Sequence, residues 1–270
     1  MNVERVLKKY NLSPDEHRDQ IFLADEDMQK EFIGYADLER DDTVLEIGAG
    51  IGNLTEHIYT QVDEVIAVEK DPRLATVLRH YEFPNVSVVN KDIMRLDLDE
   101  MDFNKVVSNL PYSVSTPMTF RLIRNSWETA VLIYQKEFAE RMVAGPGGMD
   151  YSRLSLAINY YCYSELLTEI PSDNFYPEPE TDSAAVRLKK KDVEEKDVEF
   201  WKIVKGAFQH KRKKVKNAMK DASQFLGVDE DRIKGVEDSF PDKRVYQCDV
   251  EDFEETYTIV ERLGFSEEKE

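Results

Sequence analysis

Cysteine is scarce in this chain of 270 residues, and long apolar runs are missing. The two cysteines, Cys162 and Cys248, lie far apart and have no paired spacing. Neither a disulfide framework nor a zinc site is therefore indicated, and we expect no metal chemistry. No stretch approaches the roughly 20 apolar residues that cross a bilayer, and no basic segment precedes an apolar one at either end. These features predict a soluble, cytoplasmic protein.

Positive charge is also in short supply, because 36 basic residues face 55 acidic ones and the formal net charge is −19. This balance argues at first against a nucleic acid partner, since phosphate binding normally requires a basic face. The distribution of the charges changes that interpretation. Six cations crowd into one short stretch, namely Lys211, Arg212, Lys213, Lys214, Lys216 and Lys220. The stretch is either a solvated helix face or a phosphate-binding patch, and its acidic surroundings favour the patch.

Short β-branched runs alternate with amphipathic stretches between residues 43 and 135, which is typical of βαβ units and a parallel sheet. The runs are TVLEIGAG, EVIAVEK, VSVVNKD, KVVSNLP and AVLIYQKE. In open α/β sheets, ligands bind outside the carboxyl ends of the strands. We therefore expect the chemistry at residues 48–52, Glu69, Asp92 and residues 109–112.

A polar segment, residues 189–197, follows the strand-like sequence AAVRL and suggests a domain boundary. Beyond it, apolar residues recur at helical spacing over residues 200–222 and again over residues 253–263. The chain is long enough for one full core and a smaller appended unit. We predict an α/β sheet domain over residues 1–188 and a small helical domain over residues 189–270.

The loop EIGAGIG, residues 46–52, lies between a strand and an expected helix, where glycines let a ligand approach the backbone. The glycines are Gly48, Gly50 and Gly52. Their spacing resembles the methyltransferase form more than the dinucleotide form, although a nicotinamide site or a ligand-free turn stays open. Glu69 would accept hydrogen bonds from both ribose hydroxyls of the cofactor, and Asp92 from its adenine amino group.

The tetrapeptide Asn109-Leu110-Pro111-Tyr112 matches the Asn-X-Pro-Tyr signature of methyltransferases that act on amino groups of adenine or cytosine. An exocyclic amine is a poor nucleophile because its lone pair is delocalised into the ring. The Asn109 side-chain oxygen and the Leu110 carbonyl would accept its two hydrogens and favour a pyramidal geometry. Tyr112 would stack on a base flipped into the pocket. A plain asparagine-proline turn is the alternative.

Six segments, in order, resemble the kasugamycin-resistance family of small-subunit ribosomal RNA adenine dimethyltransferases. They are VLEIGAGIGNLT, VIAVEKDPRL, VSNLPYSVSTP, QKEFAERMVAGPGGMDYSRLS, FYPEPETDSAAVRL and AFQHKRKKVKNAM. The resemblance implies a Rossmann-like class I methyltransferase fold with S-adenosyl-L-methionine as cofactor. It also implies dimethylation of adenine N6 in small-subunit ribosomal RNA during ribosome biogenesis, with the RNA or an immature subunit as partner.

The resemblance further implies roles for particular residues. Cofactor contacts are implied for Gln20, Ile21, Leu23, Gly48, Gly50, Glu69, Asp92 and Asn109. Target-base contacts are implied for Asn109, Leu110, Tyr112 and Phe175, the last suited to stack opposite Tyr112. RNA docking is implied for Lys211, Arg212, Lys213, Lys214 and Lys216. The sequence departs from the family pattern at Asp19, where the family usually has glycine, and at Ile21, Glu180 and Thr181.

Three other functions compete with this interpretation. A large-subunit RNA adenine methyltransferase is the nearest enzyme. A ribosome-assembly checkpoint protein would bind the immature subunit with methylation secondary or lost, although the intact Asn-Leu-Pro-Tyr turn argues that catalysis remains. A nicotinamide-dependent oxidoreductase would leave that turn and the basic patch unexplained. A monomer is the simplest expectation, because no heptad pattern announces a partner.

Overall fold

The computed structural model describes residues 1–15 and 19–264, which form two compact units. The sheet unit comprises Met1–Glu140 and Cys162–Lys191. The helical unit comprises Arg141–Tyr161 and the chain from Asp192 onward. No helix within the described residues is long and apolar enough to span a membrane.

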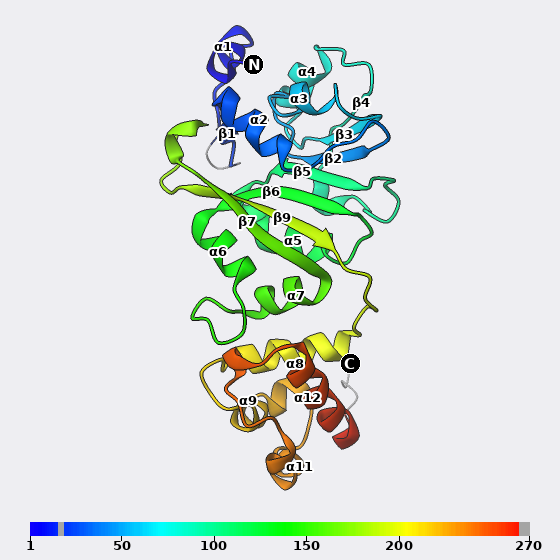
Figure 1. The fold of residues 1–270 in the computed structure, drawn as a ribbon, viewed down its shortest axis with the longest axis vertical. Coiled ribbons are helices and arrows are strands. Elements are labelled where there is room, and N and C mark those ends of the chain that lie inside the picture. Colours follow the sequence, from blue (N-terminus) through cyan, green and yellow to red (C-terminus); the bar gives the residue numbers. More distant parts are fainter. Residues whose placement is uncertain (16–18, 265–270) are drawn as a thin grey trace. The chain divides into compact units, whose positions relative to one another are not determined.

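The sheet unit is built on a seven-stranded sheet with the order β4-β3-β2-β5-β6-β9-β7 (Figure 1). Strands β4, β3, β2, β5 and β6 are parallel, whereas β9 is antiparallel to both of its neighbours. The strands are β2 (Thr43–Ile47), β3 (Glu64–Val68), β4 (Val86–Val89), β5 (Lys105–Asn109), β6 (Thr129–Gln135), β7 (Cys162–Ile170) and β9 (Ser183–Lys190). The five parallel strands coincide with the five apolar runs, so the predicted α/β fold with a parallel sheet is confirmed.

A separate two-stranded sheet pairs β1 (Phe22–Leu23) with β8 (Phe175–Tyr176). The strands are antiparallel, and Leu23 lies opposite Phe175. The Ala24 amide extends the pairing by donating to the Asn174 carbonyl at 2.7 Å. The short N-terminal strand is therefore attached to a segment about 150 residues further along the chain.

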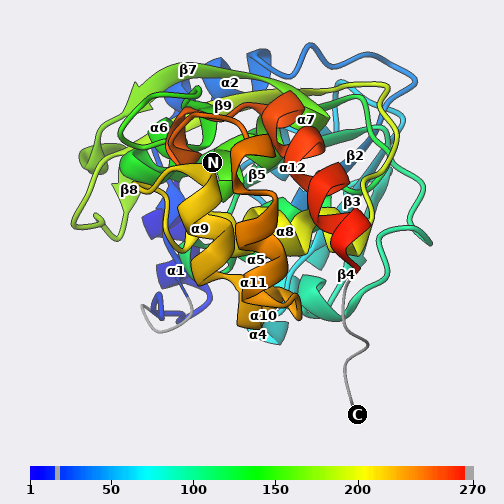
Figure 2. The same ribbon diagram turned by 90° about the horizontal axis from the view of Figure 1, so that it is seen from below.

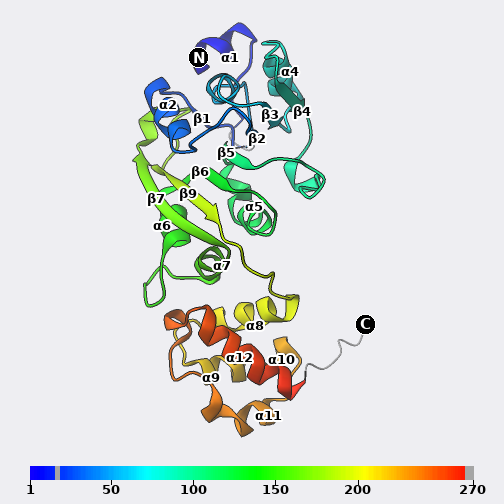
Figure 3. The ribbon, with the colours of Figure 1, turned by 45° about the vertical axis from the view of Figure 1, so that its right-hand side comes forward.

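Helices cover the seven-stranded sheet on both sides, and Figure 3 shows α2 and α5 on opposite sides of it. The helices are α1 (Val3–Lys9), α2 (Glu26–Gly34), α3 (Thr55–Ile58), α4 (Pro72–Arg79), α5 (Ser115–Leu122) and α6 (Lys136–Val143), the last of which runs across the division into the helical unit. Short 3-10 turns occupy η2 (Ile93–Arg95), η3 (Tyr112–Val114) and η4 (Ser172–Asn174). Side chains of α2, α3 and α4 form one buried cluster with strand residues such as Val44 and Val107. This packing fixes the strand ends that carry the site.

In the helical unit, α8 packs against α9 and α12 (Figure 2). Its helices are α7 (Arg153–Tyr161), α8 (Val198–Phe208), α9 (Val215–Asp221), α10 (Ser223–Leu226), α11 (Glu230–Gly235) and α12 (Val250–Leu263), with 3-10 turns η5 (Glu237–Ser239) and η6 (Val245–Gln247). Helix α8 begins where the Asp197 carboxylate accepts from the Phe200 amide at 2.7 Å. Phe200, Met219 and Phe253 are buried in the core of this unit. The predicted C-terminal helical region is confirmed.

The division of the chain differs from the predicted domains 1–188 and 189–270 in one respect. Residues 141–161 belong to the helical unit, although the sheet resumes after them. The reason is packing: Tyr151 is fully buried in the helical core, and the Tyr161 ring stacks on Trp201 with centroids 5.8 Å apart. The sequence pattern did not predict this division, because α7 is a largely buried helix that directly precedes strand β7 of the sheet.

Candidate functional site

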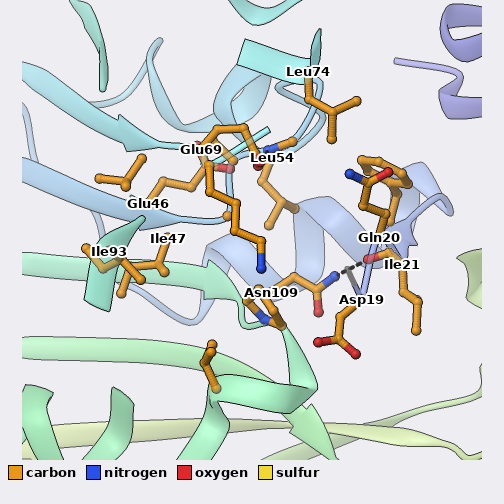
Figure 4. A pocket seen from close by; sticks show the side chains of 18 of the residues that line it. Asp19, Gln20, Ile21, Glu46, Ile47, Leu54, Glu69, Leu74, Ile93 and Asn109 are labelled. Atoms are coloured by element: carbon orange, nitrogen blue, oxygen red, sulfur yellow. Dashed lines mark hydrogen bonds between the residues drawn. The ribbon is translucent and has the colours of Figure 1, made fainter. Parts of the chain in front are cut away.

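A cavity of about 790 Å³, partly open to solvent, lies at the carboxyl ends of the parallel strands (Figure 4). Its walls come from the ends of β2, β3, β4 and β5 and from the N-terminal segment of residues 19–22. Among the residues that line it are Gln20, Ile21, Gly48, Gly50, Glu69, Asp92 and Asn109. Seven of the eight residues to which we assigned cofactor contacts thus line one cavity.

Leu23 is the eighth, and it does not line the cavity. It is fully buried, and its carbonyl oxygen accepts from Gln29 Nε2 at 2.6 Å and from Asn53 Nδ2 at 2.9 Å. Its neighbour Phe22 lines the cavity instead. Successive side chains of a strand point to opposite faces, so Phe22 and Leu23 cannot both face the same space.

The glycine loop after β2 requires glycine for two separate reasons. Gly48 and Gly50 have φ of 73° and 58°, in the left-handed region where other residues are strained. A Cβ atom on Gly50 would also lie 2.8 Å from Cε1 of Phe22. A side chain there would displace the wall of the cavity.

Glu69 ends β3 and is held by the backbone around it. Its Oε2 accepts from the Gly50 amide at 2.9 Å and its Oε1 from the Asp71 amide at 2.7 Å. Burial raises the pKa of its carboxyl, and these two backbone bonds oppose that rise. The carboxylate is thus fixed at the edge of the cavity with lone pairs left for a pair of hydroxyl donors.

Asp92 lies after β4 and starts the η2 turn, where its side chain accepts from the Met94 amide at 3.0 Å. Ile93, which follows it, is 7% exposed and lines the cavity. An acceptor next to an apolar side chain suits a planar base with an amino group.

Gln20 is anchored from the opposite side of the cavity. Its Nε2 donates to Asp71 Oδ2 at 2.9 Å, and its Oε1 accepts from the Asp15 amide at 2.9 Å. The Arg73 guanidinium is the main cause that holds the pKa of Asp71 far below its usual range, so this carboxylate stays charged. The N-terminal segment is therefore fastened to the start of α4.

Asn109 ends β5, and its amide orientation is fixed. Nδ2 donates to the Ile21 carbonyl at 2.8 Å, the dashed line in Figure 4. A carbonyl can only accept, so the amide nitrogen must face Ile21, and no donor among the described residues contacts Oδ1. The sequence predicted an acceptor at this position, and the Ile21 contact supplies its orientation.

A smaller pocket of about 170 Å³ is lined by Asp19, Ile21, Asn109, Leu110 and Tyr112, and we call it the base pocket. The Tyr112 hydroxyl lies 2.7 Å from Ser183 Oγ, which holds the ring in place. Burial is the largest cause that raises the pKa of Tyr112, so its phenol is neutral. Sequence reasoning assigned roles to Asn109, Leu110 and Tyr112 but none to Asp19.

Phe175 is not brought into this pocket. It is 4% exposed and packs in the core of the sheet unit, opposite Leu23 in the β1–β8 pair. A stacking role opposite Tyr112 would require the ring to leave the core.

The basic stretch of the helical unit divides into two groups. Lys213 pairs with Asp221, Lys214 with Asp242 at 2.5 Å, and Lys216 with Asp238 at 3.6 Å. These pairs are at the surface, where such bridges contribute about 0–1 kcal/mol. Carboxylates therefore partly neutralise three of the five cations to which we assigned RNA docking.

The other two cations, Lys211 and Arg212, line a shallow pocket together with Met149, Arg244 and Tyr246. We call these five residues the cationic pocket. Lys211 Nζ donates to the Met149 carbonyl at 3.0 Å, and Arg244 Nη1 donates to the Arg212 carbonyl. Over residues 1–15 and 19–264, its three cations form no ion pair with a carboxylate. Sequence reasoning missed Arg244 and Tyr246, because they follow the end of the basic stretch by about 25 residues and lie within an acidic segment.

Glu46 is the most deeply buried carboxyl of the cavity, at 2% exposure. Its Oε2 accepts from Thr55 Oγ1 at 2.6 Å. Burial raises its pKa from 4.5 to about 8, and the nearby Glu69 adds to the rise. Between these two pH values the folded chain holds a proton that the unfolded chain has lost, so this group makes stability fall as pH rises.

Glu46→Gln should therefore raise the free energy of unfolding at neutral pH, because glutamine is neutral in both states. From pH 4.5 to about 8, the variant should gain on the wild type by about 1.4 kcal/mol per pH unit, or about 3 kcal/mol near pH 7. Urea unfolding followed by circular dichroism across that range measures the difference. Glu255→Gln, which alters an exposed carboxyl of α12, is the control. Parallel pH curves for Glu46→Gln and the wild type would contradict the burial argument.

Residues 16–259 match the model of the family described as ribosomal RNA adenine dimethylase. The chain is 42% identical over 250 residues to the probable ribosomal RNA small subunit methyltransferase A of Thermococcus gammatolerans, covering 92% of this chain and 89% of that protein. It is 41% identical over 246 residues to the protein of the same name from Methanosarcina mazei, covering 89% of each.

Two solved structures resemble the fold. A dimethyladenosine transferase from Plasmodium falciparum superposes with a TM-score of 0.80 and 26% identity, covering 90% of this chain and 98% of that one. The 23S rRNA methyltransferase ErmE superposes with a TM-score of 0.66 and 23% identity, covering 89% and 99%. Both matches extend over most of the chain, and the second bears on the fold alone.

Proposed function

This chain belongs to the ribosomal RNA adenine dimethylase family, and from that membership we propose that it dimethylates adenine N6 in small-subunit ribosomal RNA with S-adenosylmethionine. The observation that carries the proposal is the orientation of Asn109. Its oxygen is the free acceptor at the junction of the cofactor cavity and the base pocket, because its nitrogen is committed to Ile21.

The lining of the cavity fits S-adenosylmethionine in its chemistry. A side chain on Gly50 would intrude on the wall of the cavity. Glu69 is placed for ribose hydroxyls, and Asp92 with Ile93 for an adenine ring. Gln20, Ile21, Gly48 and Asn109 complete the contacts that we assign. When bound, S-adenosylmethionine supplies an activated methyl group on a sulfonium.

The protein's part in the reaction is to prepare the amine. Asn109 Oδ1 and the Leu110 carbonyl accept its two hydrogens, which withdraws the nitrogen lone pair from conjugation with the ring. Tyr112 stacks on the flipped base, an interaction worth about 1–3 kcal/mol. We assign stacking to Tyr112 alone, because Phe175 is buried in the core. Positioning of this kind contributes to catalysis without a group of strongly shifted pKa.

The RNA partner is held by the helical unit in this proposal. Lys211, Arg212 and Arg244 have no carboxylate partner within the described residues, so they can bind phosphates without first breaking an ion pair. Lys213, Lys214 and Lys216 add weaker contacts, because RNA must compete with their carboxylates. Such contacts set the register of the protein on the RNA and do not read its sequence. We further propose that the protein acts in the cytoplasm, as a monomer, on an immature small subunit.

The test is methyl transfer from labelled S-adenosylmethionine to purified immature small subunits, followed by nucleoside analysis of the RNA. Dimethyladenosine in the small-subunit RNA is the expected product. Large-subunit RNA run in parallel should stay unlabelled, and labelling there instead would favour the other RNA class. Tight subunit binding without transfer would favour an assembly factor, which competes because the cationic pocket needs no catalysis to bind RNA.

A further inference from the structure

The carboxylate of Asp19 lines both the cofactor cavity and the base pocket. Its backbone has φ of 52°, in the left-handed region that aspartate tolerates better than most residues. Oδ2 accepts from the Ser113 amide at 3.1 Å. Asp19 is thus tied to the turn that follows the Asn-Leu-Pro-Tyr tetrapeptide, and its carboxylate is held beside the base pocket.

The second oxygen of this carboxylate, Oδ1, meets no donor among the residues that the structure describes. Within the same residues Asp19 forms no ion pair, and the Ser113 amide is the one donor to its side chain. Asp19 acts electrostatically on Tyr112 in the base pocket. Burial is the main cause that raises the pKa of Tyr112, and the nearby Asp19 raises this pKa further. Figure 4 shows the Asp19 carboxylate on the side of the cavity that holds the Asn109 side chain. Within the described residues, a carboxylate with one uncommitted oxygen therefore lies beside Asn109, the residue to which we assign the amine of the target base.

Each methylation of an amine releases a proton. Few of the groups that line the base pocket can accept this proton. Asn109 Oδ1 and the Leu110 carbonyl accept hydrogen bonds, but amide oxygens are not protonated at neutral pH. Tyr112 is a neutral phenol. Asp19 is the one anionic side chain among the residues that line this pocket.

We propose that Asp19 accepts the proton that adenine N6 loses in each of the two methyl transfers, an inference that rests on the proposed function. The nitrogen lone pair forms the N–C bond, the C–S bond breaks, and the sulfur keeps the bonding pair as a neutral thioether. The cationic N6 passes one proton to Oδ1 of Asp19, which releases it to water when the product leaves. A methylated amine that still carries this proton is a strong acid, because its lone pair is no longer conjugated with the ring. A carboxylate is therefore a sufficient proton acceptor for this step.

Asp19→Asn and Asp19→Gly test this role by single-turnover methyl transfer to immature small subunits. Both remove the base, and glycine also adopts the left-handed backbone without strain. Each variant should transfer roughly 100-fold more slowly, the lower end of the range for general acid–base catalysis. The affinity for S-adenosylmethionine, measured by calorimetry, should change less than about fivefold, since one hydrogen bond is worth about 1 kcal/mol. Added formate should speed the glycine variant by filling the space of the lost carboxylate, and should not speed the asparagine variant.

Asp37→Gly is the matched control, because Asp37 also has a left-handed backbone, with φ of 48°, and lies outside both pockets. It should transfer at the wild-type rate. A wild-type rate in either Asp19 variant would overturn the proposal. Slow transfer that formate leaves unchanged would also overturn it, because the defect would then come from the loop. The wild type reports separately on the proposed function: its failure to methylate any RNA would refute that function, whereas normal wild-type transfer leaves the variants to decide on Asp19.

Discussion

Asn109→Ala should reduce single-turnover methyl transfer by roughly 10²–10³-fold, the loss seen when one preorganised polar group is removed from a reacting centre. The variant lacks the oxygen that the amine needs and the nitrogen that orients it. S-adenosylmethionine should still bind, with a dissociation constant raised by no more than about fivefold, because the Ile21 bond is one hydrogen bond worth about 1 kcal/mol. Rapid-quench transfer assays and calorimetry on the same preparations measure the two effects.

Asn125→Ala is the matched control for this prediction. Asn125 is also an asparagine of the sheet unit, its Nδ2 donates to Asp99, and it lines neither pocket. Transfer by this control should equal that of the wild type. Undiminished turnover in Asn109→Ala would remove the amine-preparing role, and equal losses in turnover and cofactor affinity would reduce Asn109 to a cofactor contact.

Joint replacement of Lys211, Arg212 and Arg244 by glutamine should weaken binding to immature subunits by roughly 100-fold at moderate salt. The estimate assumes about 1 kcal/mol for each of three phosphate contacts. The slope of log affinity against log salt should also become shallower by about 2 to 3, because fewer counterions are released. Filter binding over a range of salt concentrations gives both quantities.

The control triple replaces Lys213, Lys214 and Lys216 by glutamine, with the same change in charge. These cations already pair with carboxylates, so their replacement should change the affinity and the salt slope much less. Equal effects of the two triples would show that net charge, and not the cationic pocket, governs binding. Unchanged slopes in both would leave the whole stretch as a solvated face.

The positions of the strand ends could be predicted because each buried strand corresponds to a local run of apolar residues. Apolar runs locate buried strands, and a parallel sheet gathers the residues that follow them at one edge. Glu69, Asp92 and Asn109 are each separated by many residues, yet the structure brings them to one cavity. The pattern of the strands therefore carried most of the information about the cofactor site.

Contacts between segments distant in sequence were not predictable in the same way. The orientation of Asn109 depends on a carbonyl 88 residues earlier. The burial of Phe175 depends on its register opposite Leu23. Both are set by tertiary packing, for which a single sequence offers no periodic signal.

The pairing of the cations with carboxylates could not be predicted from the sequence. Six neighbouring cations suggested one patch, but the structure divides them according to the acids that lie nearby in space. Arg244 joins Lys211 and Arg212 through the turn before α12. A run of like charge thus says where cations occur, and the fold decides which of them remain unneutralised.

The small β1–β8 sheet gives the site a mechanical linkage. One of its strands continues from Gln20 and Ile21 in the cofactor cavity, and the other carries Phe175. The Ala24 bond to the Asn174 carbonyl extends the joint beyond the two strands. The N-terminal wall of the cavity and the Phe175 segment are therefore joined by backbone hydrogen bonds, although about 150 residues separate them in sequence.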